Sequence, residues 1–289
     1  MLNSTATQLL ISANSLEEAM LLHDLGVPWV DIKEPRNGPL GRPSLELVEQ
    51  AALWLGERRS GSEQAWSIAG GELVDWNLDE DQRFLDRLAP RNGCVKWGLA
   101  HCAGSDQWMR KVRELLNQIE QNSGDRTQGI LVHYADHPRV DAPIWDEVLD
   151  AAVAIRIDKI LIDTAVKDGS SLTDIIDKER LEKMLKSAGE KSVAVAIAGS
   201  IPLSHIRELS LLGPRWIGLR GAVCTDTTDR SSSISPALVQ QALSASNLQT
   251  RPLSDIFSLD FADIGDHTAS PCESCHEPQP LRGESRKGP

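Results

Sequence analysis

Eight short apolar runs recur along the chain, and a longer segment with hydrophobic positions at helical spacing follows each of them. This alternation indicates βαβ units and a parallel sheet. Eight such units predict an α/β fold, a closed (β/α)8 TIM barrel, although a doubly wound open sheet has the same local pattern. The expected strands are Gln8–Ser12, Trp29–Lys33, Ala65–Ala69, Cys94–Gly98, Gly129–Tyr134, Lys159–Asp163, Ser192–Ala198 and Trp216–Arg220.

Polar and proline residues mark the starts of the expected helices. Ser15 precedes an acidic first turn, and Ser44 stands in the same position before the second helix, so both serines are predicted N-caps. Proline is tolerated in the first turn of a helix because its missing N–H would have no partner there. Pro143, Pro202 and Pro236 are placed accordingly.

The character of the sequence changes near Ser246. Residues 1–245 are predicted to form the barrel domain, and residues 246–289 a flexible C-terminal extension, because proline, serine and charged residues dominate there. Cys272–His276 in this extension spell the C-x-x-C-H pattern of haem attachment. That chemistry needs an exported chain, so we interpret the match as accidental.

Charge and composition narrow the classes of partner. The formal net charge is -12, which argues against binding nucleic acid or an anionic membrane through the general surface. The N-terminus lacks the basic and apolar regions of a signal peptide, and no apolar stretch is long enough for a membrane span. The five cysteines form no disulfide framework. We therefore expect a cytoplasmic protein with reduced thiols.

Reactive side chains are concentrated at the ends of the expected strands, where the active sites of parallel barrels lie. Asp31 and Lys33 stand two residues apart at the end of the second strand and therefore on the same face. Lys96 lies on the fourth strand, and Asp163 with Lys167 follows the sixth. At the end of the fifth strand, His133, Tyr134 and Asp136 are further candidates, and the Tyr134 hydroxyl could donate to a substrate oxygen.

A lysine in an apolar strand must pair its ammonium or lose its charge. Nucleophilic use at neutral pH requires lowering its pKa by about 2.5 to 3.5 units, or about 3.4 to 4.8 kcal/mol. Burial and a second ammonium lower the pKa, whereas Asp31 and Asp163 raise it. On this reasoning Lys33 and Lys167 are both candidates for the free amine, with another lysine charged as an acid.

Two small-residue turns follow the seventh and eighth strands, the usual phosphate-binding loops of this fold. In AIAGSIP, Gly199 and Ser200 permit close backbone approach, and a helix starts near Pro202. In IGLRGAV, Arg220 could offer a charged fork beside the backbone donor of Gly221. The pair of turns predicts a phosphate site.

The segments LLISANSLEEA, VDIKEPRNGPLG, VKWGLA, HYAD, IDTAVKDGSSLTD, AIAGSI and GLRGAVCTDTTDR together resemble the (5-formylfuran-3-yl)methyl phosphate synthase family of methanofuran biosynthesis. The resemblance implies a barrel lyase that joins two molecules of glyceraldehyde 3-phosphate, with loss of phosphate and water and without metal or organic cofactor. It further implies that Lys33 is the Schiff-base lysine and Lys96 the proton acceptor, with Asp31, Asp163 and Lys167 as remaining site charges.

Two rival functions share these features. Another sugar-phosphate barrel, such as an aldolase, decarboxylase or isomerase, could carry the DIK sequence at Asp31–Lys33, and a non-catalytic barrel could serve as a scaffold. The complete set of lysines and aspartates favours an enzyme. The partners expected are a phosphorylated triose and further copies of the chain in a homo-oligomer, with neither nucleic acid nor membrane.

Overall fold

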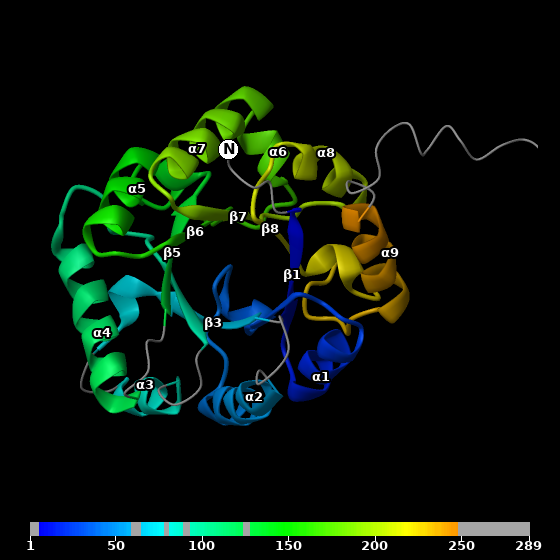
Figure 1. The fold of residues 1–289 in the computed structure, drawn as a ribbon, viewed down its shortest axis with the longest axis horizontal. Helices are drawn as coiled ribbons and strands as arrows, with labels where there is room; N and C mark the ends of the chain where they lie inside the picture. Colours follow the sequence, from blue (N-terminus) through cyan, green and yellow to red (C-terminus); the bar gives the residue numbers. More distant parts are fainter. Residues whose placement is uncertain (1–5, 59–64, 78–80, 89–92, 124–127, 248–289) are drawn as a thin grey trace, which may run out of the picture. The chain divides into compact units, whose positions relative to one another are not determined.

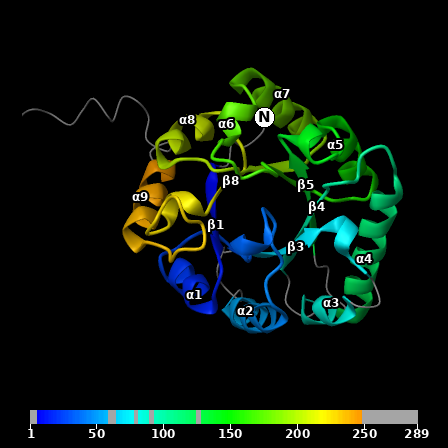
Figure 2. The ribbon, with the colours of Figure 1, turned by 180° about the vertical axis from the view of Figure 1, so that it is seen from behind.

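Strand pairing closes the sheet into a ring. The computed structural model describes residues 6–58, 65–77, 81–88, 93–123 and 128–247, and within them parallel strands β1 to β8 pair in sequence order, with β8 beside β1. Figure 1 shows the ring of strands inside a ring of helices, and Figure 2 shows it from behind. The predicted (β/α)8 barrel is confirmed, and the open-sheet alternative is excluded by the pairing of β1 with β8. The strands are β1 Gln8–Ala13, β2 Trp29–Ile32, β3 Ala65–Glu72, β4 Cys94–Gly98, β5 Gln128–Tyr134, β6 Lys159–Asp163, β7 Ala194–Ile197 and β8 Trp216–Leu219.

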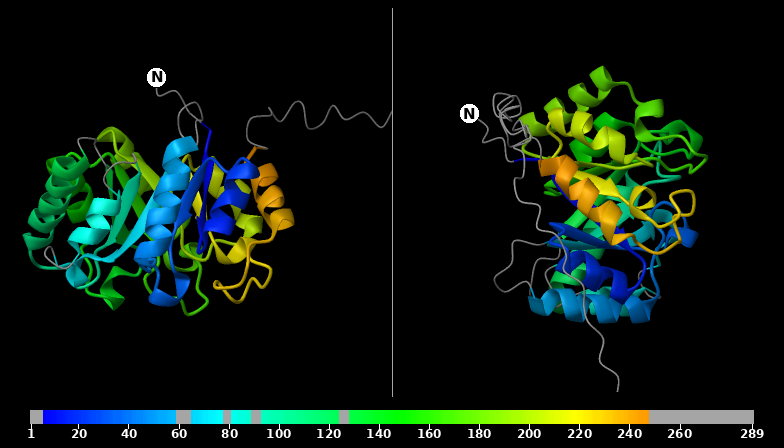
Figure 3. Two further views of the ribbon diagram at one scale, coloured as in Figure 1. Left: turned by 90° about the horizontal axis from the view of Figure 1, so that it is seen from below. Right: turned by 90° about the vertical axis from the view of Figure 1, so that its right-hand side faces the viewer.

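The helices lie along the outside of the strands, as the side views in Figure 3 show. The Ser15 side chain accepts a hydrogen bond from the Glu18 N–H, and Ser44 does the same for Leu47, so both predicted caps are confirmed. The α-helices are α1 Leu16–Asp24, α2 Leu45–Arg58, α3 Gln82–Leu88, α4 Gln107–Ser123, α5 Trp145–Ala154, α6 Leu172–Ile175, α7 Lys178–Glu190, α8 Ile206–Leu211 and α9 Pro236–Asn247. Short 3-10 helices are η1 Pro35–Asn37, η2 Leu73–Asp75, η3 His137–Arg139, η4 Leu203–His205 and η5 Gly221–Val223.

The C-terminal boundary differs slightly from the expected one. Helix α9 continues to Asn247, so the last helix crosses the boundary predicted at residue 245. The rest of the predicted extension, including Cys272–His276, lies outside the described residues. No helix in the described ranges has both the length and the apolar character that crossing a membrane requires.

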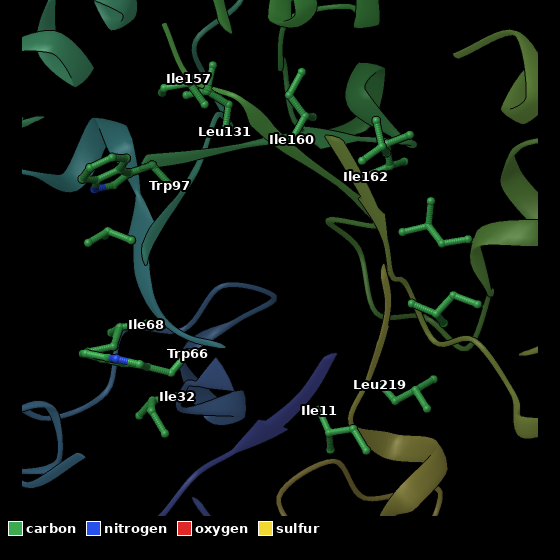
Figure 4. Close-up of a cluster of buried hydrophobic side chains, with 14 of the residues drawn as sticks. Ile11, Ile32, Trp66, Ile68, Trp97, Leu131, Ile157, Ile160, Ile162 and Leu219 are labelled. Atoms are coloured by element: carbon green, nitrogen blue, oxygen red, sulfur yellow. The ribbon is translucent and has the colours of Figure 1, made fainter. Parts of the chain in front are cut away.

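Alternate residues of each strand belong to two separate apolar layers. Ile11, Ile32 and Leu131 pack with helix residues in the outer layer, part of which is drawn in Figure 4. The inner layer fills the lumen, where Trp29 and Trp216 meet edge to face with ring centroids 4.7 Å apart. This packing makes the lower barrel a solid core. Inward-facing residues above it form the floor and walls of the site.

Candidate active site

A pocket of about 630 Å³ opens at the C-terminal ends of the strands. Its size is within the range of small-molecule sites. The pocket brings together residues that lie far apart in the sequence. Asp31 is fully buried on β2, two residues before Lys33, and is not among the residues that line the pocket. The predicted residues that line the pocket are Lys33, Lys96, Asp163, Lys167, Gly199, Ser200, Arg220 and Gly221.

Asp31 and Lys96 form a buried ion pair. The Lys96 Nζ lies 2.6 Å from the Asp31 Oδ2, and the two side chains are 3% and 0% exposed. Asp31 also accepts hydrogen bonds from the Ser67 hydroxyl at 2.7 Å and the Ser12 hydroxyl at 3.1 Å. These donors supply the partners that a carboxylate needs when it is removed from water. With both Asp31 oxygens engaged in this way, the ammonium of Lys96 has a fixed counter-charge.

Asp163 and Lys167 form the second ion pair of the pocket, with 2.9 Å between Nζ and Oδ1. The Lys167 ammonium also donates to the Thr164 hydroxyl, and the Thr164 N–H donates to Asp163 at 2.7 Å. Burial acts to raise the pKa of Asp163, but the charges of Lys167 and Lys33, together with the hydrogen bonds from Lys167 and Thr164, hold that pKa below its ordinary value. Asp163 is therefore a carboxylate at neutral pH.

Lys33 differs from the other two lysines. Within the part of the chain that the structure describes, its ammonium forms no ion pair, although Asp31 and Asp163 lie nearby. Burial lowers the pKa of Lys33 to about 7, and the neighbouring charges of Lys96 and Arg230 act in the same direction, against Asp163 and Asp31. A substantial share of its amine is consequently unprotonated at neutral pH.

The predicted phosphate turns present free backbone donors. Gly199 has a φ of 113°, and a Cβ there would lie 2.8 Å from the Thr164 side chain, so both conformation and space require glycine. Among the described residues, the N–H groups of Gly199, Ser200, Gly221 and Ala222 donate to no partner. Successive free amides of this kind can bind an anion.

The expectation for Arg220 needs correction. Its Nε donates to the Arg230 carbonyl at 2.9 Å, and its Nη groups donate to the carbonyls of Ser12 and Ser232 and pair with the Glu18 carboxylate. The guanidinium fork is thus already used to join β1, α1 and the loop that follows η5. Arg220 lines the pocket as a supporting residue, and the structure leaves no free fork for a phosphate.

Tyr134 donates its hydroxyl to Glu72, a residue that the sequence reasoning missed. The other Glu72 oxygen accepts from the Ala100 N–H at 3.0 Å. Burial raises the pKa of Glu72, although these two hydrogen bonds act to lower it, and burial together with Glu72 raises the pKa of Tyr134. A Cβ on Gly98 would lie 2.3 Å from Glu72, so the glycine in β4 makes room for this carboxylate. A glycine inside a strand indicates close approach of another group, so Gly98 was the sequence feature that could have indicated a neighbour such as Glu72.

Two further candidates from the end of β5 do not line the pocket. Asp136 accepts hydrogen bonds from the N–H groups of Ala165 at 2.7 Å and Val166 at 2.9 Å, so it shapes the loop that carries Lys167. His133 packs against Trp145 of α5, with ring centroids 5.6 Å apart. Burial lowers the pKa of His133 to about 3, so it is neutral at physiological pH.

Solved structures of other proteins share the barrel. The 3-hexulose-6-phosphate synthase from Salmonella typhimurium aligns with a TM-score of 0.56 and 16% identity, over 85% of this chain and 100% of its own. At this identity the likeness concerns the fold alone. It agrees with the ring of strands described above.

Sequence relatives carry a more specific likeness. The (5-formylfuran-3-yl)methyl phosphate synthase of Methanosarcina barkeri is 28% identical over 238 residues, which is 81% of this chain and 97% of that protein. The enzyme of the same name from Methanothermobacter thermautotrophicus is 28% identical over 218 residues, 75% of this chain and 89% of that protein. A family model described as 4-HFC-P synthase matches residues 9–243, which span every strand of the barrel and the candidate site. The chain belongs to the 4-HFC-P synthase family.

Proposed function

We propose that this protein is a (5-formylfuran-3-yl)methyl phosphate synthase of methanofuran biosynthesis, a carbon-oxygen lyase that joins two molecules of glyceraldehyde 3-phosphate. The observation that carries the proposal is the state of Lys33. It is the pocket lysine whose amine is unpaired among the described residues, and its pKa is about 7. Lys96 and Lys167 have carboxylate partners.

The first step is the formation of a Schiff base. The free amine of Lys33 attacks the aldehyde carbon of one triose phosphate, water leaves, and a protonated imine forms. This cation is close to Asp31 and Asp163, whose negative charges favour it. The same charges disfavour the neutral amine, so burial of Lys33 is essential to its reactivity.

The protonated imine then acts as an electron sink. Removal of the proton beside the imine carbon sends the electron pair toward nitrogen, and phosphate leaves from the third carbon with the electrons of its C–O bond. We assign the acceptance of this proton to Lys96, as the family resemblance implies. Its partner Asp31 supports this role because transfer of a proton from Lys96 to Asp31 frees the amine.

Carbon-carbon bond formation with the second triose phosphate follows. Loss of phosphate leaves an enol on the first triose, and its terminal carbon attacks the central carbonyl carbon of the second triose phosphate, which reacts as its ketone isomer, in an aldol-type step. The free hydroxyl of the second fragment then closes on the carbonyl beside the imine, two water molecules leave to form the furan, and hydrolysis of the imine releases Lys33. The Asp163 and Lys167 pair is suited to move protons in these steps, since it joins a carboxylate to a cation at 2.9 Å. The free amides of Gly199, Ser200 and Gly221 would hold the phosphate that the product retains.

The test combines turnover with trapping. Purified protein is incubated with glyceraldehyde 3-phosphate, and phosphate release and furan absorbance are followed together. Borohydride is added to a parallel sample, and the modified lysine is identified by mass spectrometry. We expect both products and an adduct on Lys33 that Lys33→Met abolishes. An adduct on Lys167, or undiminished turnover by Lys33→Met, would refute the assignment.

Other outcomes identify the rivals. An adduct on Lys33 with cleavage of a sugar phosphate, but without furan absorbance, would indicate an aldolase or decarboxylase. A folded protein that releases no phosphate and forms no adduct would indicate a non-catalytic barrel. The matched control is Lys186→Met, because Lys186 lies on α7 with a side chain that is 79% exposed.

A further inference from the structure

Arg230 is a pocket residue outside the predicted set. It lies in the loop between η5 and α9, and its Cγ would be 3.5 Å from a Cβ placed on Gly221. Its Nη2 donates to the backbone oxygens of Gly38 at 3.2 Å and Pro35 at 3.4 Å. In the described ranges, no carboxylate is within ion-pair distance of this guanidinium and no other donor of it has a partner. Most of its fork is therefore free.

Arg220 and Arg230 differ in the partners of their guanidinium groups. Arg220 uses its donors within the protein and has the charge of Glu18 beside it. Arg230 is half-buried at the wall of the pocket, and no carboxylate of the described residues pairs with its positive charge. A cation removed from water without a counter-ion is costly. The planar guanidinium fork matches the geometry of a phosphate group, so a phosphate that binds there would supply the missing charge.

The surroundings of Arg230 indicate which of the two triose substrates carries the phosphate that it binds. Arg230, Lys33 and Asp163 line the same pocket, and the charge of Arg230 acts on both of the other groups. We propose that Arg230 binds the phosphate of the triose that condenses with Lys33, and thereby selects phosphorylated over non-phosphorylated aldehydes. This inference rests on the proposed function, because it takes Lys33 as the amine that receives the aldehyde.

The same geometry gives Arg220 a positioning role. Its Nε binds the carbonyl of Arg230 and its Nη2 the carbonyl of Ser232, each at 2.9 Å. Glu18 holds the Arg220 guanidinium and also accepts a hydrogen bond from the Ile234 N–H at 3.1 Å. The buried pair thus anchors the loop at Arg230 and on its C-terminal side. The sequence pattern predicted Arg220 as the phosphate-binding arginine. The hydrogen bonds favour Arg230, the residue whose carbonyl Arg220 binds.

Borohydride trapping on Lys33 tests the proposal. Wild type, Arg230→Gln and Arg230→Lys are titrated with glyceraldehyde 3-phosphate and with glyceraldehyde at about pH 9, above the pKa of Lys33 of about 7, so that loss of a neighbouring charge leaves the free-amine fraction nearly unchanged. We expect Arg230→Gln to raise the half-trapping concentration of the phosphate ester about 10- to 100-fold and to leave that of glyceraldehyde unchanged. Arg230→Lys should recover part of the loss. The matched control is Arg36→Gln, which removes an exposed charge nearby.

Equal titrations of wild type and Arg230→Gln with glyceraldehyde 3-phosphate would overturn the role of Arg230 while leaving the proposed function intact. Equal losses for both aldehydes would also overturn it, because phosphate recognition must discriminate between them. If wild type traps neither aldehyde, the proposed function fails, and calorimetry with inorganic phosphate decides on Arg230. Weaker phosphate binding by Arg230→Gln would then support the site, and unchanged binding would refute it.

Discussion

Lys96 on β4 reaches past β3 to Asp31 on β2, and the two charges meet 2.6 Å apart in the lumen of the barrel. The intervening strand contributes only small side chains on this face, Ser67 and Ala69, which are register partners of Asp31 and Lys96. Ser67 also donates to Asp31. The pair engages the carboxylate that stands two residues before Lys33 on the same face of β2, and among the described residues Lys33 is the pocket lysine without an ion pair.

Breaking this ion pair is expected to destabilise the protein strongly. Asp31→Asn leaves the Lys96 ammonium buried without a counter-charge, which costs about 3 to 5 kcal/mol in comparable cases. Urea unfolding should show this loss in the free energy of unfolding. Asp24→Asn is the control, because the Asp24 side chain is 75% exposed and its removal should change stability little. A loss below about 0.5 kcal/mol for Asp31→Asn would contradict the pairing.

The reactivity of Lys33 should follow pH with a midpoint near its pKa of about 7. Only the unprotonated amine is a nucleophile, so the rate of labelling should rise through this pH and level off above it. Competitive labelling with a small amine reagent, read by peptide mass spectrometry, measures this midpoint directly. The exposed Lys186 serves as the internal reference for reagent reactivity. A labelling midpoint for Lys33 near the ordinary lysine value of about 10.4 would refute the lowered pKa.

Stability should also depend on pH through Lys33. The folded state releases this proton near pH 7, whereas the unfolded chain keeps it to about 10.4. Between these values the unfolded state binds more protons, so the free energy of unfolding contributed by Lys33 rises with pH. Lys33→Met removes this dependence and should be more stable than wild type near pH 7 by about 0.5 to 2 kcal/mol.

Thermal unfolding at a series of pH values compares the two proteins. The free energy of unfolding of wild type should rise steadily relative to that of Lys33→Met from pH 7 toward pH 10. A relative stability that stays constant or falls in that direction would show that Lys33 is protonated in the folded protein.

The space above Gly98 provides a test of the Glu72 and Tyr134 pair. Gly98→Ala places a Cβ against the Glu72 carboxylate and should cost about 1 to 3 kcal/mol through displacement of that side chain. Gly189→Ala in α7 is the matched control, because no atom lies within 4 Å of its added Cβ. In a helix this change should stabilise by about 0.5 to 1 kcal/mol. Chemical denaturation of both variants measures the two changes in the free energy of unfolding. An unchanged stability of Gly98→Ala would contradict the position of the Glu72 carboxylate beside Gly98.

The local sequence pattern was sufficient to predict the strands and the shared face of the two site residues on β2. Because strand residues alternate between faces, Asp31 and Lys33 had to share a face, and both lie on the lumen side of the barrel. The fold rule that sites form at the C-terminal ends of strands brought in Asp163 and Lys167 as well. These inferences need only spacing along the chain.

Glu72 shows where local reasoning ends. Nothing in its own strand distinguishes it from an exposed charge at the end of a run, and its partner Tyr134 is 62 residues away. Arg230 was missed for a related reason. It follows a polar segment, and only the folding of that segment over η5 brings its side chain beside Gly221.

By itself the sequence determined the eight alternating strands and helices and the group of lysines and aspartates at the strand ends, because hydrophobic period and strand alternation are local properties of the chain. The tertiary structure decided that the sheet closes, with β8 beside β1, and which charges pair. Lys96 and Lys167 pair with the carboxylates and Arg220 pairs with Glu18, whereas within the described ranges Lys33, with its lowered pKa, and Arg230 have no carboxylate partner. Ion pairing and desolvation depend on distances of a few ångströms between side chains from different strands, and the closed barrel sets those distances.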